Sequence, residues 1–445
     1  MILPPEAHSL LLALAPAFTT PTFQRFITLM AAAILTPGRR TVANLLRTAK
    51  PFAQGHPTTF QRVFSSARWS ALRLAACLVR FVLRVCPLSD PILLVGDDTV
   101  DGHKGKKVWG KARHRDAVRS SHSYTAWRYG HRWVVLSVLV RFPFTQRHWA
   151  LPVLVDLYLS AELNQLRGRP HRTPAQLMCR LLRLMLWWFP RRRFVFIGDS
   201  GYGSHEVARF VYRHRQQLSL VSKFHPQANL YESPPPYQGQ GRPRVKGKAL
   251  AKPSEVVGQK RKRRRLRVDW YGGGTRQVAV VSGKGQWYKS GQGLVPVLWV
   301  FVEDRSGTHR EEYFFTTDLS LSLVALISRY TSRWNIETTF QEMRAHLGLE
   351  TTRGWCRQTV LRVAPCLFGL YTAVALLYQQ LPVCKRAGAV WWPGKSSVTF
   401  SDALTAVRRW LWTEWVFPQV DENAAIQKLP DELREMLLTT LAPAA

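Results

Sequence analysis

The chain has 445 residues, of which 46% are hydrophobic and 17 are Trp, and its formal net charge is +35. The apolar content excludes a disordered basic tail, and the charge indicates a polyanionic partner such as nucleic acid, because Lys and Arg displace counterions from phosphates. We expect no membrane span, no secretory signal and no structural zinc: no apolar run is long enough, no basic segment precedes the first apolar stretch, and the six cysteines form no CxxC pair.

Residues 1–88 are expected to be helical. Apolar-periodic segments at 23–35 and 41–46 are separated by the breaker Pro37-Gly38, and a third segment follows at 58–64. A short basic helical array of this kind docks on DNA, although an inert basic cap has the same pattern. We therefore predict a DNA-binding domain over 1–88. Its expected contacts include the two arginines before the second segment, Arg39 and Arg40.

The stretch 92–99 is predicted to be a buried strand that ends in two carboxylates, Asp97 and Asp98. A continuous apolar strand is buried on both faces, as in the middle of an α/β sheet. Two adjacent acids in so basic a chain need a cation nearby. The basic loop that follows carries four lysines that we expect to contact the DNA backbone, Lys104, Lys106, Lys107 and Lys111.

A second buried strand, 194–197, runs into Asp199. The C-terminal edge of an interior strand is where α/β sheets present groups to ligands. With Ser200-Gly201 after it, Asp199 also fits a turn or helix cap. Other elements expected in this region are a hairpin of 123–128 and 133–141 around 129–131, helices at 173–188 and 206–216, and a strand at 218–224.

The composition changes over 226–317, which is rich in Pro, Gly, Lys and Arg and contains the basic run Lys260–Arg265. Such a run is usually a solvated loop, with a nucleic-acid contact as the second interpretation. Short alternating strands are expected at 266–270, 277–282, 295–302 and 312–317. We predict a β-rich insertion domain over 226–317, with Arg263 and Arg264 as DNA contacts.

The stretch 330–349 is predicted to be one helix with an apolar stripe on one face. Spacings of 3, 7 and 14 residues place four functional side chains on the neighbouring face: Tyr330, Arg333, Glu337 and Arg344. On an arbitrary helix this would be a solvated face with i,i+4 charge pairs. The two aspartate motifs elsewhere in the chain favour a functional interpretation.

Three acidic positions therefore stand out, namely Asp98 or its neighbour Asp97, then Asp199, then Glu337. Two Mg²⁺ ions about 3.5–4 Å apart need hard oxygen ligands, and they clamp the attacking and leaving oxygens of a phosphodiester. We expect two Mg²⁺ ions at this site, with Mn²⁺ as a substitute.

The combination resembles the DDE transposases of bacterial insertion sequences, in the cut-and-paste branch with the signature Tyr-x2-Arg-x3-Glu-x6-Lys and a β insertion. The resemblance covers about residues 90–350, and Arg344 stands where the signature has Lys. It implies an α/β, ribonuclease H-like catalytic core interrupted by the β-rich insertion, with helical N- and C-terminal regions. The implied core parts are 89–225 and 318–354, and 355–445 is a helical, candidate dimerisation region. It favours Asp98 over Asp97 as the first metal ligand.

The resemblance implies a transposase that binds terminal inverted repeats, cleaves at the element ends and joins the 3′-OH ends to target DNA. We expect a homodimer on double-stranded DNA in the bacterial cytoplasm, associated with the nucleoid. Tyr330, Arg333 and Arg344 would contact DNA near the metals, and Tyr313 of the insertion would contact a flipped base, with Trp287 and Trp299 as alternatives. Two other functions stay open: a ribonuclease H-like, structure-specific nuclease without strand transfer, and an inactive, transposase-derived DNA-binding protein.

Overall fold

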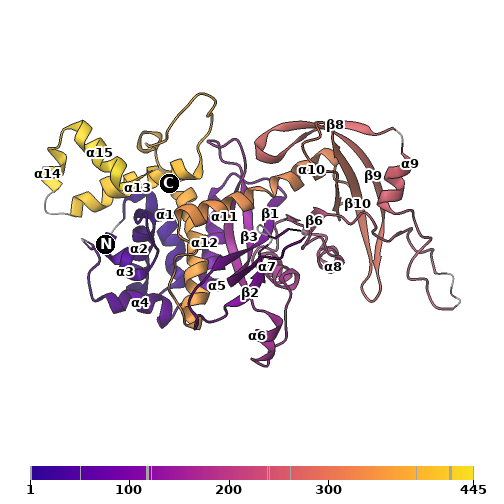
Figure 1. The fold of residues 1–445 in the computed structure, drawn as a ribbon, viewed down its shortest axis with the longest axis horizontal. Coiled ribbons are helices and arrows are strands. Elements are labelled where there is room, and N and C mark those ends of the chain that lie inside the picture. The colour runs from indigo at the N-terminus through magenta and orange to yellow at the C-terminus, as the bar shows by residue number, and fades with distance from the viewer. Residues whose placement is uncertain are drawn as a thin grey trace.

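The computed structural model describes residues 3–50, 52–116, 120–121, 123–237, 239, 241–260, 262–386, 388–419 and 423–443. Its centre is a mixed sheet with helices packed on it, and a helical lobe and a β-rich lobe lie at opposite ends of the molecule (Figure 1). The main path of the sheet runs in the order β2-β3-β1-β5-β6-β11-β10-β9-β7. The predicted α/β class is confirmed.

Five strands form the catalytic part of the sheet: β1 (Ile92–Gly102), β3 (Trp127–Val140), β4 (Trp149–Tyr158), β5 (Phe194–Gly198) and β6 (Leu218–Lys223). The strand β3 pairs antiparallel with both β1 and β4, whereas β5 pairs parallel with both β1 and β6. The order β4-β3-β1-β5-β6 is the mixed five-stranded sheet expected of a ribonuclease H-like core. Wholly apolar stretches such as 194–197 are buried because helices cover both faces of a sheet of this kind.

Helices from the core segments pack on this sheet. Helix α7 (Pro174–Trp188) lies on β3 and β4, and α8 (His205–Arg213) lies on β6 and β10. Helix α10 (Leu323–Ser332) contacts β5, β6 and β11, and α11 (Asn335–His346) contacts β1 and β4. A short helix, α6 (Ala161–Gln165), follows β4.

The N- and C-terminal helices form one lobe (Figure 1). Its members are α1 (Pro5–Leu14), α2 (Thr20–Leu35), α3 (Val42–Thr48), α4 (Pro57–Ser65), α5 (Ala71–Val85), α12 (Arg357–Gln380), α13 (Phe400–Leu411), α14 (Asn423–Gln427) and α15 (Asp431–Leu441). The long helix α12 packs against α1, α4, α5, α13 and β4, so it joins this lobe to the central sheet. The two terminal regions, far apart in the sequence, therefore share one hydrophobic core.

Helix α12 corrects one expectation from the sequence. By length and composition it could cross a membrane, with a mean hydropathy of 1.9 in its most apolar 18-residue window. However, 67% of that window is buried inside the fold, and the core helix of a globular protein passes the same test. Packing on both β4 and the N-terminal helices accounts for an apolar surface on every side.

The insertion continues the central sheet. Its strands are β7 (Leu230–Tyr231), β8 (Arg264–Asp269), β9 (Thr275–Lys289), β10 (Gly293–Asp304) and β11 (Glu312–Thr316), with α9 (Pro253–Gln259) between the first two. Strand β11 pairs antiparallel with β6, so the insertion strands add to the edge of the core sheet. Arg261 of the basic run lies outside the described residues.

Three predicted elements differ from the structure. Strand β1 continues past Asp97 and Asp98 to Gly102, because β3 pairs with it over that whole length. The hairpin around 129–131 is wrong: β3 runs through these residues, and its outer partner there is β2 (Ala112–Arg115). The single helix 330–349 is two helices, α10 and α11, separated at Arg333 and Trp334.

Candidate active site

Asp97 and Asp98 point to opposite faces of the sheet, since consecutive side chains alternate along a strand. A side chain at Gly96 would meet Met178 of α7 at 2.5 Å, so the face of positions 96 and 98 is the α7 face. Asp97 is on the other face, where Nη1 of Arg333 donates to its Oδ2 at 2.9 Å. The strand therefore directs Asp97 towards the start of α11.

Asp98 is neutralised on its own face. Nε of Arg132, on the neighbouring strand β3, donates to Oδ2 of Asp98 at 2.5 Å, and the Tyr202 hydroxyl donates to Oδ1 at 3.4 Å. Tyr202 is 1% exposed, and burial together with the nearby aspartates raises the pKa of its phenol well above the usual value. It therefore stays a proton donor to Asp98.

Asp199 follows β5 directly, in register with Asp97 because Gly96 pairs with Gly198. Its Oδ1 accepts the backbone N–H groups of Gly201 and Tyr202, at 2.9 and 3.3 Å, so the carboxylate both shapes the turn and faces β1. A Cβ at Gly203 would lie 2.5 Å from the carbonyl oxygen of Lys223. Glycine is required there for the turn to pack against β6.

Glu337 lies in the first turn of α11 and shares a guanidinium with Asp97. Nη2 of Arg333 donates to Oε1 of Glu337 at 2.6 Å, while Nη1 of the same group binds Asp97. Asp199 also interacts electrostatically with Arg333. Asp97 of β1 and Glu337 of α11 thus bind one arginine whose side chain is 10% exposed, and Asp199 follows β5 in register with Asp97.

The cluster has more negative charge than its surroundings neutralise. Burial raises the pKa of Asp97 to about 8, and Asp199 and Asp98 add to this although Arg333 opposes it. Burial also raises the pKa of Asp199, again against Arg333 and with a contribution from Asp98. The Asp97 and Glu337 carboxylates hold the pKa of Arg333 above its usual value despite burial. A site of this kind favours the arrival of further cations.

The geometry differs from the expectation that favoured Asp98 as the first metal ligand. Asp97 shares Arg333 with Glu337, whereas Asp98 is on the opposite face with Arg132 and Tyr202. The apolar pattern that ends at position 95 could not separate the two, because adjacent strand residues look alike in sequence and differ only in the face that they occupy.

Burial corrects three of the DNA contacts expected from the sequence. Tyr330 is 1% exposed and stacks on Phe314 with ring centroids 4.1 Å apart. Arg40 is 4% exposed and donates to backbone carbonyls, including that of His346 at 2.6 Å. Arg333 is 8% exposed and neutralises the acids. None of the three presents its polar group to DNA in this conformation, since each is enclosed by packing.

The other predicted contacts are accessible. Arg39, Lys104, Lys106, Lys107, Arg264 and Arg344 are exposed, and Lys111, Arg263 and Tyr313 are partly exposed. Arg344 donates to Glu350 at 3.0 Å and to the hydroxyl of Thr99 on β1, so it lies beside the strand of the acidic cluster. Tyr313 packs on Phe301, whereas Trp299 is buried. Their contacts with DNA stay predictions.

Comparisons with known proteins identify the family of this chain. A family model for a DDE superfamily endonuclease matches residues 13–277, a span that includes Asp97 and Asp199 and ends before α11. The chain belongs to the DDE superfamily of endonucleases. No curated protein matches the chain. Among solved structures, the chain is similar to a piggyBac transposase in a synaptic complex with hairpin DNA, with a TM-score of 0.42 and 11% identity over 96% of this chain and 78% of that one.

DDE superfamily nucleases use divalent metal ions. In this DDE endonuclease, several residues of the site were not predicted from the sequence. They are Arg132 and Tyr202, which hold Asp98, and a separate group on β1 and β3: Asp101, His103 and His131. The spacing Asp101-x-His103 was a usable signal. Its partner His131 is paired with Asp101 only through the antiparallel register of β1 and β3.

Proposed function

We propose that the chain is a DNA transposase of the insertion-sequence type, which cleaves at element ends and joins the 3′-OH ends to target DNA. The observation that carries the proposal is the guanidinium of Arg333 shared by Asp97 and Glu337, with Asp199 in register with Asp97 at the end of the neighbouring strand. The acids come from three elements of a ribonuclease H-like sheet in a DDE endonuclease of net charge +35.

The donor set fits magnesium. Three carboxylates supply the hard oxygen ligands that Mg²⁺ prefers, and no thiol or imidazole belongs to the set. The guanidinium of Arg333 between Asp97 and Glu337 shows that the space between these carboxylates accepts positive charge. Asp97, Asp199 and Glu337 would hold two ions. When bound, Mg²⁺ activates a water or 3′-OH as the nucleophile and stabilises the leaving oxygen.

The remaining site residues position these acids. Arg132 and Tyr202 fix Asp98 on the far face of β1, which keeps the strand in register and leaves Asp97 free to face α11. Arg333 compensates the charges of Asp97 and Glu337. Arg344 would bind a phosphate beside Thr99 and the acids.

The proposed DNA path follows the exposed cations. The loop with Lys104, Lys106 and Lys107 leaves β1 shortly after the acids, so its lysines would bind the backbone near the scissile phosphate. Arg39 on the helical lobe, and Arg263, Arg264 and Tyr313 on the insertion, would bind the terminal repeat further away. A homodimer would hold the two element ends together. The protein would act in the bacterial cytoplasm, on the nucleoid.

A direct test uses the DNA that flanks the coding sequence in its native element. The chain is incubated with labelled element ends and a target plasmid in Mg²⁺, Mn²⁺ or Ca²⁺. We expect end cleavage and joined products in Mg²⁺ and Mn²⁺, and binding without cleavage in Ca²⁺. Cleavage without any metal would overturn the proposal.

The matched endonuclease family keeps a second function open, a nuclease that cuts structured DNA without strand transfer. In the same assay this nuclease would give cut ends and no joined product, and it would prefer branched substrates to linear element ends. An inactive DNA-binding protein would bind the ends and cut nothing in any metal.

A further inference from the structure

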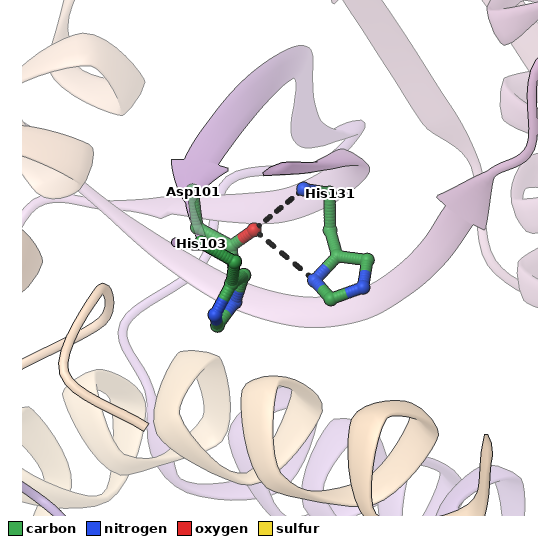
Figure 2. Close-up of side chains that lie close together, drawn as sticks. All are labelled: Asp101, His103 and His131. Carbon is green, nitrogen blue, oxygen red and sulfur yellow. Dashed lines mark hydrogen bonds and ion pairs between the residues drawn. The ribbon is translucent and has the colours of Figure 1, made fainter. Parts of the chain in front are cut away.

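A second cluster of ionisable side chains lies four residues beyond Asp97 on the same strand. It contains Asp101 at the end of β1, His103 just after it, and His131 on β3 (Figure 2). One oxygen or nitrogen atom from each side chain lies within 4.8 Å of the others. Asp101 and His131 are each 1% exposed, and the His103 side chain is 8% exposed. The cluster shares no residue with the acidic site.

The hydrogen bonds of His131 fix its free nitrogen. Nε2 lies 2.8 Å from the carbonyl oxygen of Trp109, which can only accept, so Nε2 carries a proton. In the neutral ring, Nδ1 then carries a lone pair and no proton. This atom lies 3.5 Å from Oδ1 of Asp101 (Figure 2). A proton on Nδ1 would form a charge-assisted hydrogen bond, which has a length of about 2.7–2.9 Å. Nδ1 of His131 and Oδ1 of Asp101, two acceptors 3.5 Å apart, instead leave room for a cation that binds both.

The carboxylate of Asp101 is oriented towards the two imidazoles. Its Oδ1 accepts the backbone N–H of His131 at 3.0 Å, and its Oδ2 accepts Nε1–H of Trp133 at 3.1 Å. Nε2 of His103 lies 3.3 Å from the same Oδ2. Hydrogen bonds to a carbonyl behind the histidine and to an indole behind the carboxylate are the outer contacts that orient ligands in protein metal sites.

Two of the separations are close to those around a small tetrahedral ion. Two ligand atoms about 2.0–2.1 Å from a zinc ion lie about 3.3–3.4 Å apart. Nε2 of His103 lies 3.3 Å from Oδ2 of Asp101, and Nδ1 of His131 lies 3.5 Å from Oδ1. A cavity of ≈ 10 Å³ opens on all three side chains, on Thr352 and Gly354 of the segment that leads into α12, and on Thr359 in the first turn of that helix. That volume suits one ion or one water molecule.

We propose that Asp101, His103 and His131 bind one divalent transition-metal ion, with Zn²⁺ as the expected occupant. Two imidazole nitrogens and one carboxylate oxygen suit zinc, whereas magnesium prefers the all-oxygen set around Asp97. The fourth position faces the cavity and takes a water molecule. Gly130 allows β3 to approach β1 at this point. A Cβ there would lie 1.7 Å from the carbonyl oxygen of Asp101 and would force β3 away from β1.

The ion would join three parts of the fold: the end of β1, the loop that begins at His103, and β3. That loop carries Lys104, Lys106 and Lys107. The site would therefore fix the loop next to the catalytic strand, and this consequence rests on the proposed function, whereas metal binding itself does not.

The experiment measures metal in the full chain, purified without an affinity tag from zinc-supplemented cells and dialysed against metal-free buffer with EDTA briefly present. We expect about one zinc per chain by mass spectrometry of the metal. The variants His103→Gln and His131→Gln should lower zinc affinity at least about 100-fold. The control His205→Gln changes another buried histidine, bonded to Gln292 and Trp287, and should keep the zinc.

Cobalt provides the second measurement. Co²⁺ in the apo chain should give visible absorption bands that Asp199→Asn and Glu337→Gln leave unchanged and that His103→Gln removes, which separates this site from the acidic cluster. A chain without zinc whose melting temperature does not rise with added Zn²⁺ would overturn the proposal. So would zinc that His103→Gln retains or that Asp199→Asn removes. Failure of DNA cleavage with zinc still bound would count against the proposed function alone.

Discussion

Asp97 and Asp101 are two aspartates on one strand and one face of the sheet, and their surroundings are opposite. Asp97 has other aspartates nearby, and burial with their repulsion raises its pKa to about 8. Burial acts to raise the pKa of Asp101 as well, but the neighbouring side chains of His103 and His131 hold it well below its usual range. The carboxylate of Asp97 shares its one arginine with Glu337, whereas the carboxylate of Asp101 lies among several nitrogen atoms.

The difference shows how one strand serves two purposes. The excess negative charge around Asp97 costs stability and favours the binding of cations. The nitrogens around Asp101 stabilise the end of the strand whether or not DNA is present. A change in the first region should therefore affect catalysis, and a change in the second should affect stability.

The largest expected effect is that of Glu337→Gln. The variant removes one of the three acids, and DNA cleavage should fall at least about 10³-fold, or about 4 kcal/mol of transition-state stabilisation, while affinity for element ends changes by less than about twofold. Cleavage rates and gel-shift titrations measure the two. Glu342→Gln is the matched control on the same helix, because Glu342 binds Tyr371 instead, and it should cleave normally. Equal losses in both variants would contradict the assignment of Glu337.

The variants Asp97→Asn and Asp98→Asn test which of the two neighbouring acids is the first metal ligand. Cleavage by Asp97→Asn should be at least about 10²-fold slower than by Asp98→Asn, a difference of about 2.7 kcal/mol. The reason is that Asp97 shares Arg333 with Glu337, whereas Asp98 is bound by Arg132 on the opposite face. Single-turnover cleavage in Mg²⁺ measures both rates. If Asp98→Asn is the slower enzyme, the first ligand is Asp98.

A change at Asp101 should lower the free energy of unfolding, measured in EDTA, more than a change at Asp97 does. Asp101→Asn should lose about 2 kcal/mol, because the amide cannot accept every hydrogen bond of the carboxylate and leaves buried donors unpaired. Asp97→Asn should change stability by less than about 1 kcal/mol, since it also relieves repulsion from Asp199 and Asp98. Urea unfolding followed by Trp fluorescence tests this. A larger loss in Asp97→Asn would break the comparison between the regions.

The smallest expected effect comes from Glu342, whose pKa is raised by burial without repulsion from a second acid. Burial raises the pKa of Glu342 to about 7, although the Tyr371 hydroxyl and Arg147 oppose this, and no second acid contributes. The folded chain therefore binds a proton on Glu342 that the unfolded chain releases above about pH 4.5. This contribution to stability is complete below that pH and is lost as the pH rises towards 7.

Relative to Glu342→Gln, the wild-type chain should thus lose about 1–2 kcal/mol of stability between pH 5 and pH 8. Melting temperatures of both chains across that range measure the difference, and taking the difference removes the effect of the other titrating groups. Parallel curves for the two chains would show that Glu342 is ionised throughout.

Much of the fold was predictable because periodicity and buried strands are local signals. Helix α7 and strands β5 and β6 lie where the sequence places them, and the α/β class follows from the alternation of apolar strands and helices. The path of β3 was not predictable. Tyr129-Gly130-His131 has the composition of a turn, and only pairing with both β1 and β2 keeps these residues in a strand.

By itself, the sequence determined that the protein has a large core, a strong positive charge and three acidic motifs beside buried apolar segments. Tertiary structure alone decided which of two adjacent aspartates faces the others, which cations are buried, and that His131 lies beside Asp101. The physical reason is that composition and spacing report local preference and total charge. The face of a strand and the partner of a side chain depend on segments far away in the chain.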